Sequence, residues 1–228
     1  MRESLNLALT LTAIALVASL GLAAAYTATY QIKEQYDLEE REAARREVLP
    51  GAEDAVFEEV PTDSLVSGKS FVYYAARAGA GSQDVLGYTF TAYGKGYSST
   101  IVTMVGVDTE FAVTGIRIIS QQETPGLGTK IQEILSKNTL WQVLSGNAAE
   151  EIGARPWFQA QFDGRGEDRL RVVKAKTDDG VMAITGATIS SEAVAGSVRR
   201  GIAMLRSIVG PGSGPAADTT AVAGEGTP

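Results

Sequence analysis

An uncharged apolar run of 22 residues, Leu5–Tyr26, constrains this chain more than any other feature. A helix needs about 20 apolar residues to cross a bilayer, so the run predicts a membrane-spanning helix. A cleaved signal peptide is the alternative, because Ala23–Ala25 forms a small-residue cleavage pattern. The apolar cores of signal peptides are shorter, about 7 to 15 residues, and Tyr26 and Tyr30 supply an interfacial aromatic edge. We therefore expect a retained anchor over residues 1–30.

The segment after the anchor is densely charged. Ten of the fifteen residues from 33 to 47 are Lys, Arg, Asp or Glu. Opposite charges at helical spacing, such as Glu42 and Arg46, favour a solvated helix that Pro50 ends. Residues 31–50 are therefore predicted to form a charged helical stalk, with a docking surface as the alternative. Lys and Arg near the two ends of the apolar run give no decisive bias, so charge alone does not set the orientation.

Composition excludes several classes of chemistry. The 228 residues include no Cys and no His, which rules out disulfides, thiolate or imidazole metal ligands and histidine-based catalysis. The formal net charge of −7 argues against nucleic acid as a partner. We expect no metal site and no catalytic residue of the chain's own, so redox chemistry would depend on an organic cofactor.

The middle of the chain has the pattern of an antiparallel sheet. Four segments rich in Val, Ile, Thr, Tyr and Phe are separated by short turns, which leaves no room for the crossover helices of a parallel sheet. We predict an α+β fold, rich in antiparallel sheet, for residues 51–209. The predicted strands are Phe71–Ala78, Val85–Tyr93, Ser99–Val107 and Val113–Ser120.

A second α/β portion follows the predicted sheet. We expect a helix at Thr139–Leu144, then strands at Trp157–Phe162, Leu170–Ala175 and Val181–Ile184. Residues 210–228 contain small, polar and turn-forming types almost exclusively. They are predicted to be a disordered tail, because such a composition cannot bury a core.

The stretch Ile184–Ser191 places four hydroxyl side chains and a glycine just ahead of a helical pattern. Apolar residues recur at helical spacing from Glu192 to Val209, and Ser190 or Ser191 is expected to cap this helix. Free amides and the helix dipole at such a terminus favour a phosphate. From the residues alone, a loop that merely caps a helix is the favoured interpretation, and an anion site is the alternative.

The string Thr185-Gly186-Ala187-Thr188, followed by Ile189-Ser190-Ser191, resembles the flavinylation motif of the FMN-binding domain family. In that family a separate flavin transferase joins FMN to the last threonine of the motif through a phosphoester bond. The resemblance implies that Thr188 carries the covalent FMN and becomes a phosphorylated residue. It also implies that Thr185, Gly186 and Ala187 approach the phosphate, with Ser190 and Ser191 at the start of the helix beside it.

A second signature of the same family is Glu123-Thr124-Pro125-Gly126-Leu127-Gly128. The resemblance implies that Glu123, Thr124, Leu127 and Gly128 meet the ribityl chain or the ring, and that Leu127 lies against the ring. The two preceding residues depart from the family pattern, since Gln121 and Gln122 stand where a His is frequent.

Both signatures, the anchor and the stalk together are similar to the G subunits of Rnf-type ferredoxin:NAD⁺ oxidoreductases, membrane complexes that couple electron flow to ion transport. This resemblance implies an electron-relay subunit in a bacterial cell membrane, single-pass, with its soluble domain on the outer side. Other subunits and a flavin transferase would be its partners. The C subunit of a sodium-translocating NADH:quinone oxidoreductase is one alternative, and a non-redox, membrane-anchored anion-binding module is another.

Overall fold

The computed structural model describes residues 2–52, 54–79, 81–134, 155–175 and 177–210. The chain divides into two compact units, one up to Ala43 and one from Ala44 onward. The predicted helix at Thr139–Leu144 and the predicted tail after Gly210 lie outside the described residues.

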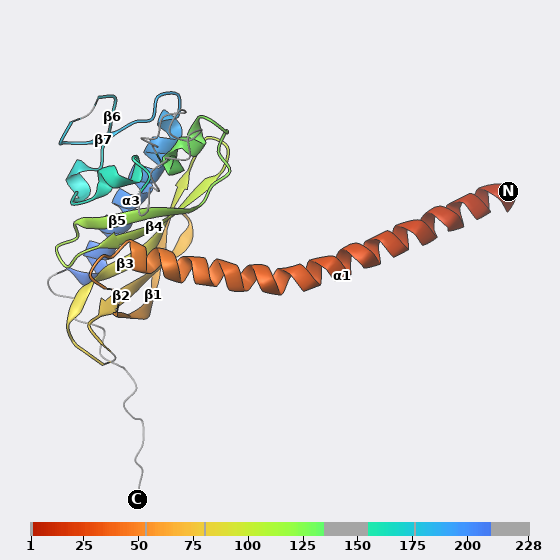
Figure 1. The fold of residues 1–228 in the computed structure, drawn as a ribbon, viewed down its shortest axis with the longest axis horizontal. Coiled ribbons are helices and arrows are strands. Elements are labelled where there is room, and N and C mark those ends of the chain that lie inside the picture. The colour runs from red at the N-terminus through yellow and green to blue at the C-terminus, as the bar shows by residue number, and fades with distance from the viewer. Residues whose placement is uncertain (1, 53, 80, 135–154, 176, 211–228) are drawn as a thin grey trace, which may run out of the picture. The chain divides into compact units, whose positions relative to one another are not determined.

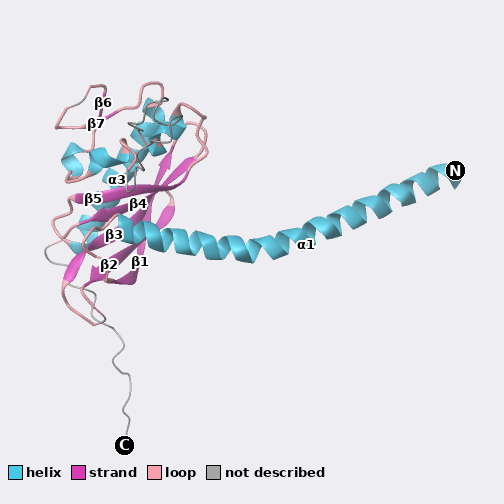
Figure 2. Cartoon of the chain, viewed as in Figure 1, coloured by secondary structure: helices cyan, strands magenta, loops and turns pink. Residues whose placement is uncertain are grey.

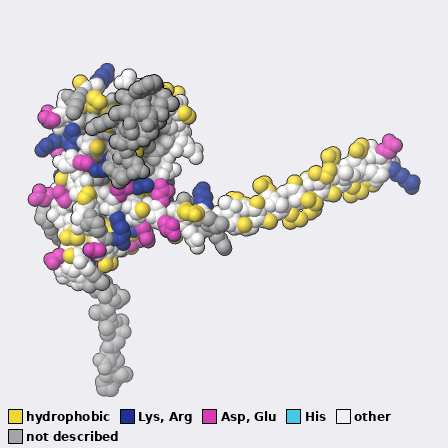
Figure 3. All heavy atoms as spheres, viewed as in Figure 1, with side chains coloured by type: hydrophobic (Ala, Val, Ile, Leu, Met, Phe, Trp, Pro, Cys, Tyr) yellow, Lys and Arg dark blue, Asp and Glu magenta, His cyan; other side chains and the backbone are white. Residues whose placement is uncertain are grey.

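The first unit is helical. A single helix, α1, runs from Arg2 to Glu47, so the apolar run and the charged segment after it form one continuous element. Within the described residues one stretch, Arg2–Tyr30, is long and apolar enough to cross a membrane. Its leucine, isoleucine and valine side chains are exposed along the helix (Figure 3), because no other part of this unit covers them. An exposed apolar surface of this length fits a lipid environment.

The second unit is built on a five-stranded antiparallel sheet in which each strand pairs with the next along the chain (Figure 1). The predicted α+β fold with an antiparallel sheet is therefore confirmed, and the four predicted strands correspond to β2 through β5. The strands are β1 (Val56–Val66), β2 (Lys69–Arg77), β3 (Val85–Lys95), β4 (Thr100–Val107) and β5 (Val113–Ser120).

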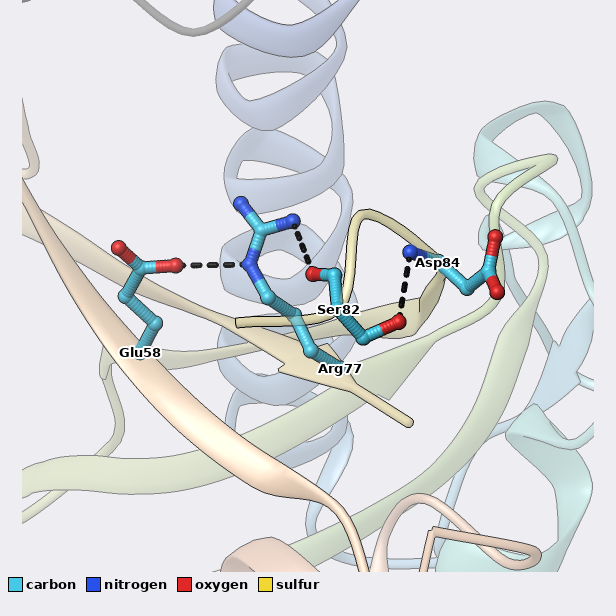
Figure 4. Close-up of polar contacts among 4 residues, drawn as sticks. All are labelled: Glu58, Arg77, Ser82 and Asp84. Carbon is cyan, nitrogen blue, oxygen red and sulfur yellow. Dashed lines mark hydrogen bonds and ion pairs between the residues drawn. The ribbon is translucent and has the colours of Figure 1, made fainter. Parts of the chain in front are cut away.

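Strand β1 was not predicted, because Glu58, Glu59 and Asp63 interrupt its apolar pattern and Pro61 lies in its middle. It is an edge strand, where proline and charge are tolerated. An ion pair joins it to β2, its neighbour in the sheet (Figure 4). Arg77 of β2 pairs through Nε with Oε2 of Glu58 at 2.7 Å, and its Nη1 donates to the carbonyl of Ser82 in the β2–β3 loop at 3.2 Å.

Helix α3 (Thr188–Val209) covers one face of the sheet (Figure 2). Four of the five apolar residues that the sequence pattern places at three- to four-residue spacing are fully buried, and the fifth, Ile208, is partly buried. Two glycines allow close packing: a Cβ at Gly201 would overlap the ring of Phe90, and one at Gly94 would overlap the carbonyl of Ala193. The residues of α3 in this core are Ala193, Val194, Ala195, Val198, Ile202 and Leu205.

Residues 44–52 pack on the opposite face of the sheet. Val48 and Ala44 are buried against Met104 of β4. The next residue of that strand, Val105, belongs to the core on the α3 side, because successive side chains of a strand point to opposite faces of the sheet. A Cβ at Gly106 would overlap the Val48 carbonyl, which also accepts a hydrogen bond from Oγ1 of Thr114 at 2.6 Å. The end of α1 is thus part of the second unit's core.

The segment that leads to α3 differs from expectation. The predicted strand Trp157–Phe162 is wrong: a 3₁₀-helix, η2, spans Gln159–Phe162. The buried residues there are Phe158, Gln159 and Phe162, whereas Ala160 is exposed, which is helical rather than alternating spacing. The predicted strands around it shorten to β6 (Val172–Val173) and β7 (Val181–Met182), which pair in parallel.

Candidate functional site

Helix α3 begins at Thr188, four residues earlier than the apolar pattern indicates. Gly186, just before it, has φ +81°, a left-handed conformation that glycine adopts without strain. Ser191 donates the first backbone hydrogen bond of the helix, to the Ala187 carbonyl at 3.0 Å. The amides of residues 188–190 come before this bond, so they form the electropositive terminus at which an anion is stabilised.

The prediction that Ser190 or Ser191 caps the helix is wrong. Both residues lie inside α3, and the N-cap residue, Ala187, makes no side-chain hydrogen bond. Ser191 accepts instead from the amide of Ile184 at 3.0 Å and donates to the Ala187 carbonyl at 2.9 Å, which fixes the motif's backbone. Within the described residues, no serine hydroxyl accepts a hydrogen bond from the amides at the start of the helix.

The second signature forms a tight loop beside this terminus. The amide of Leu127 donates to the Thr124 carbonyl at 3.2 Å, and Gly126 has φ +75°. A 3₁₀-helix, η1 (Gly128–Gln132), follows the loop. Leu127 remains 45% exposed, and its Cδ2 lies 3.1 Å from where a Cβ on Gly186 would be. The two signatures are therefore close together. Because Gly186 has no side chain, there is room beside it for the side chain of Leu127.

Glu123 is the centre of the hydrogen-bond network behind the loop. Its side chain is buried, and its Oε2 accepts from the hydroxyl of Ser190 at 2.6 Å and from the amide of Tyr97 at 3.0 Å. Its Oε1 accepts from the amides of Ser98 and Ser99, at 3.1 and 3.0 Å, and from the Ser99 hydroxyl at 3.2 Å. One carboxylate thus joins the β3–β4 turn, the signature loop and the first turn of α3.

The charge of Glu123 is stabilised in place. Burial raises the pKa of its carboxyl group, but the hydrogen bonds from Ser190 and from the three backbone amides outweigh burial and hold the pKa below its ordinary value. Two glycines make room for it. A Cβ on Gly96 would lie 2.5 Å from Oε1, and one on Gly128 would lie 2.6 Å from the Cβ of Glu123.

These segments enclose one side of a cavity of about 620 Å³, within the usual size range of small-molecule sites. Thr188 is exposed at this cavity, and within the described part of the chain its hydroxyl makes no hydrogen bond. The walls combine an aromatic ring, apolar side chains and a helix terminus. The lining residues are Tyr97, Glu123, Thr124, Leu127, Gly128, Gly186, Ala187, Thr188, Ile189 and Ser190.

Most of the expected site residues meet at this cavity, though Thr185 and Ser191 do not line it. Thr185 is exposed, and the buried Ser191 acts on the backbone instead. Sequence reasoning missed Tyr97 and Ile189. Ile189 follows Thr188 directly, so its position next to the motif could have indicated it. Tyr97 gives no such signal, because its turn is held at the cavity by tertiary hydrogen bonds, among them the bond from its amide to Glu123, 26 residues away.

The departure at Gln121 and Gln122 has a structural role. The side-chain oxygen of Gln121 accepts from the amide of Glu123 at 2.7 Å, and its amide nitrogen donates to Gln132 of η1 at 3.0 Å. The amide of Gln122 donates to the hydroxyl of Ser99 at 2.8 Å. The Gln121 side chain thus orders the entry to the signature loop, whereas the Gln122 contact is made by a backbone amide that any residue but proline would supply.

Comparison with known proteins agrees with this geometry. The FMN-binding domain family matches residues 96–203, a range that includes both signatures. The fold is similar to the crystal structure of the C subunit of the Na⁺-translocating NADH-quinone reductase from Parabacteroides distasonis, with a TM-score of 0.51 and 17% identity, covering 78% of this chain and 96% of that one. At that identity the likeness concerns the fold alone.

Sequence relatives distinguish between the two families considered for this chain, the G subunits and the C subunits. The G subunit of the Na⁺-translocating ferredoxin:NAD⁺ oxidoreductase complex of Acetobacterium woodii is 30% identical, over 89% of this chain and 92% of the relative. The G subunit of the proton-translocating complex of Clostridium ljungdahlii is 32% identical, over 64% of this chain and 65% of the relative. The chain therefore belongs to the family of G subunits of ion-translocating oxidoreductase complexes and carries that family's FMN-binding domain.

Proposed function

We propose that this chain is the electron-relay subunit of an Rnf-type ion-translocating oxidoreductase, with FMN held covalently at Thr188. The observation that carries the proposal is the position of Thr188. It is the first residue of α3, it is exposed, and it faces the cavity that the two family signatures line together.

The cavity's residues fit FMN part by part. The amides at the start of α3 suit a phosphodiester, which keeps one negative charge after attachment. Leu127, Ile189 and the exposed ring of Tyr97 offer apolar and aromatic surface to a flat ring system. FMN supplies the redox chemistry when bound, and the protein's residues hold it, orient it and restrict the access of water.

Attachment requires help from outside this chain. A threonine hydroxyl is a weak nucleophile without a base beside it, and no basic or acidic group hydrogen-bonds Thr188 within the described residues. We infer that a flavin transferase removes the hydroxyl proton and supplies the activated flavin phosphate. The threonine oxygen would bond to the flavin phosphorus as the bond from that phosphorus to the donor's second phosphate breaks, so a flavin dinucleotide donor would release its other half as a nucleoside monophosphate.

The rest of the chain supports a relay rather than a complete catalyst. Without Cys or His it cannot hold an iron–sulfur cluster through thiolates or a haem through imidazole. Electrons must therefore reach the flavin from other subunits of the complex. We propose that Arg2–Tyr30 is a retained single span in a bacterial cell membrane and that the FMN-binding domain lies on the outer side.

The tether is tested by changing Thr188 to Val and expressing the protein together with a flavin transferase. Val keeps the shape of the side chain but removes the nucleophile, so we expect in-gel flavin fluorescence after SDS denaturation to disappear. The Thr188→Val protein should keep its thermal unfolding midpoint, because residue 188 is exposed. Thr185→Ser is the control and should keep its fluorescence. Covalent flavin in Thr188→Val would show that the tether is elsewhere.

A further inference from the structure

A second cavity lies beside the flavin cavity and shares one wall with it. It measures about 500 Å³, and its wall includes Tyr97, which also lines the flavin cavity and is 73% exposed. The β1–β2 turn, the β3–β4 turn and α3 form the rest of the wall through Ser67, Lys69, Lys95 and Arg200. Three different parts of the fold thus bring three cationic side chains together.

The charge of this cavity contrasts with that of the protein. The chain has a formal net charge of −7, yet no carboxylate lines this cavity. Lys69 is held over the ring of Tyr93, with Nζ 4.1 Å from the ring centroid. In the part of the chain that the structure describes, neither Lys69, Lys95 nor Arg200 forms an ion pair. The carboxylate of Glu123 is near this cavity, but it is buried behind the wall and already bonded to the amides of Tyr97, Ser98 and Ser99. The three exposed cations therefore create a local positive field on an acidic molecule.

The cavity does not resemble a nucleotide-binding loop, although Gly94-Lys95-Gly96 borders it. The amides of Tyr97, Ser98 and Ser99, which could hold a phosphate, are bonded instead to the buried carboxylate of Glu123. Only long cationic side chains and hydroxyl groups are left to face solvent. Lysine and arginine can bind phosphate as well as carboxylate. Without free backbone amides, however, this wall lacks the close enclosure that holds one small phosphate, and three separate cations suit several carboxylates on another protein.

We propose that Lys69, Lys95 and Arg200 form a docking site for the acidic surface of a protein that exchanges electrons with the flavin. The inference rests on the proposed function, because Tyr97 places the docking site next to the cavity assigned to FMN. Opposite charges accelerate encounter and orient the partners, which suits electron-transfer contacts that are small and short-lived. The site therefore determines which partner reaches the flavin and from which side.

The binding part of the proposal is tested on the full-length flavinylated protein in detergent, with a fluorescein-labelled hexaglutamate peptide as the probe. We expect anisotropy to report binding that weakens as salt is added. Changing Lys69, Lys95 and Arg200 to Gln should weaken binding about tenfold. The matched control changes the exposed Arg169, Arg171 and Lys174 to Gln. It alters net charge by the same amount, so equal losses in the two variants would overturn the proposal.

Two competing occupants are outcomes of the same experiment. If about 1 mM inorganic phosphate displaces the peptide completely, the cavity is a small-anion site and the proposal is wrong. Flotation with phosphatidylglycerol vesicles tests a lipid surface. If the Lys69, Lys95 and Arg200 variant loses vesicle binding while its peptide binding is unchanged, the patch serves the membrane instead.

The electron-transfer part is tested by reoxidising the reduced flavin with two inorganic oxidants of opposite charge. Each ferricyanide or hexaammineruthenium(III) ion takes one electron from the flavin. Loss of the three cations should slow the ferricyanide reaction about tenfold and leave the hexaammineruthenium reaction unchanged or faster. Equal rates in wild type and variant would overturn the proposal. A protein that carries no flavin would instead refute the proposed function, and the peptide measurement would still report on the patch.

Discussion

A single buried carboxylate, that of Glu123, organises the candidate site through its hydrogen bonds within the protein. Burying a charge is costly unless hydrogen bonds replace the lost water. Here, the hydroxyls of Ser190 and Ser99 and three backbone amides do so. The resemblance to the family assigned Glu123 to the ribityl chain or ring. Its contacts within the protein indicate that it also sets the shape of the cavity, by fixing three of the cavity's segments to each other.

Changing Glu123 to Gln is expected to lower both stability and flavin content. The amide nitrogen of Gln is a donor, so it would face amides and hydroxyls that also donate. A buried hydrogen-bond mismatch of this kind costs about 1–3 kcal/mol of unfolding free energy, which urea denaturation measures. The control is Glu133→Gln, because Glu133 is an exposed carboxylate after the same loop. A variant with unchanged stability and full flavin content would contradict this role.

The same carboxylate predicts a pH dependence. Since the pKa of Glu123 is lowered in the folded state, its contribution to stability is present above the ordinary Glu pKa. That contribution is lost as pH falls through the lowered value. Asp163 acts oppositely, because burial raises its pKa despite the nearby Arg155, so its contribution favours low pH.

The difference in unfolding free energy between wild type and Glu123→Gln removes the effect of Asp163, which both proteins share. We expect this difference to shrink as pH is lowered from about 6 to about 3, across and below the ordinary Glu pKa. Urea denaturation at each pH measures it. A difference that stays constant over this range would mean that the ionised form of Glu123 is not the stabilising one.

At the scale of elements, α3 depends on glycines as much as on its apolar stripe. Gly201 lies against the ring of Phe90, whereas Gly196 has only the flexible end of Arg200 nearby, 3.3 Å from where a Cβ would be. Both are helix-interior glycines of the same helix. Mutation of either glycine to Ala therefore raises helix propensity by the same amount, but the steric cost of the added methyl group differs between the two positions.

Gly201→Ala is expected to destabilise the domain by about 1–3 kcal/mol, since the new methyl group overlaps a fully buried ring in a close-packed core. Gly196→Ala should be neutral or stabilising by up to about 1 kcal/mol. Thermal or urea unfolding of the two variants measures the contrast. Equal effects would mean that α3 can shift away from the sheet without loss.

The success of sequence-based prediction varied between elements for physical reasons. Strands β2 to β5 combine β-branched residues with clear turns, so local pattern indicated them. Strand β1 lies at an edge where charge and proline are tolerated, and its pattern is weak. The segment Trp157–Phe162 is too short for a helical period to be distinguished from a strand period. Its apolar residues Phe158 and Phe162 were therefore assigned to a strand. At the site, the motif residues were recognisable, but the contacts of Glu123 with Tyr97 depend on tertiary structure.

At the scale of the whole molecule, the folded domain begins before the boundary that the charged segment and Pro50 indicate. The sequence predicts a globular part that begins at residue 51. In the structure, Ala44, Val48 and Leu49 are buried in the second unit, and Glu47 pairs with Arg117 of β5. Helix α1 therefore ends inside the core of the domain that follows it.

We expect a fragment that begins at Ala44 to fold and a fragment that begins at Gly51 to be strongly destabilised, both ending at residue 228. The shorter fragment lacks Val48 and Leu49, whose burial contributes roughly 1.5–3 kcal/mol each. It also leaves Thr114 without its acceptor, the Val48 carbonyl, and uncovers Met104. Those losses are a large part of the 5–15 kcal/mol that stabilises a typical domain.

Differential scanning calorimetry, with near-ultraviolet circular dichroism to detect fixed aromatic packing, compares the two fragments. If both melt at the same temperature, residues 44–50 belong to the stalk and the core begins at residue 51.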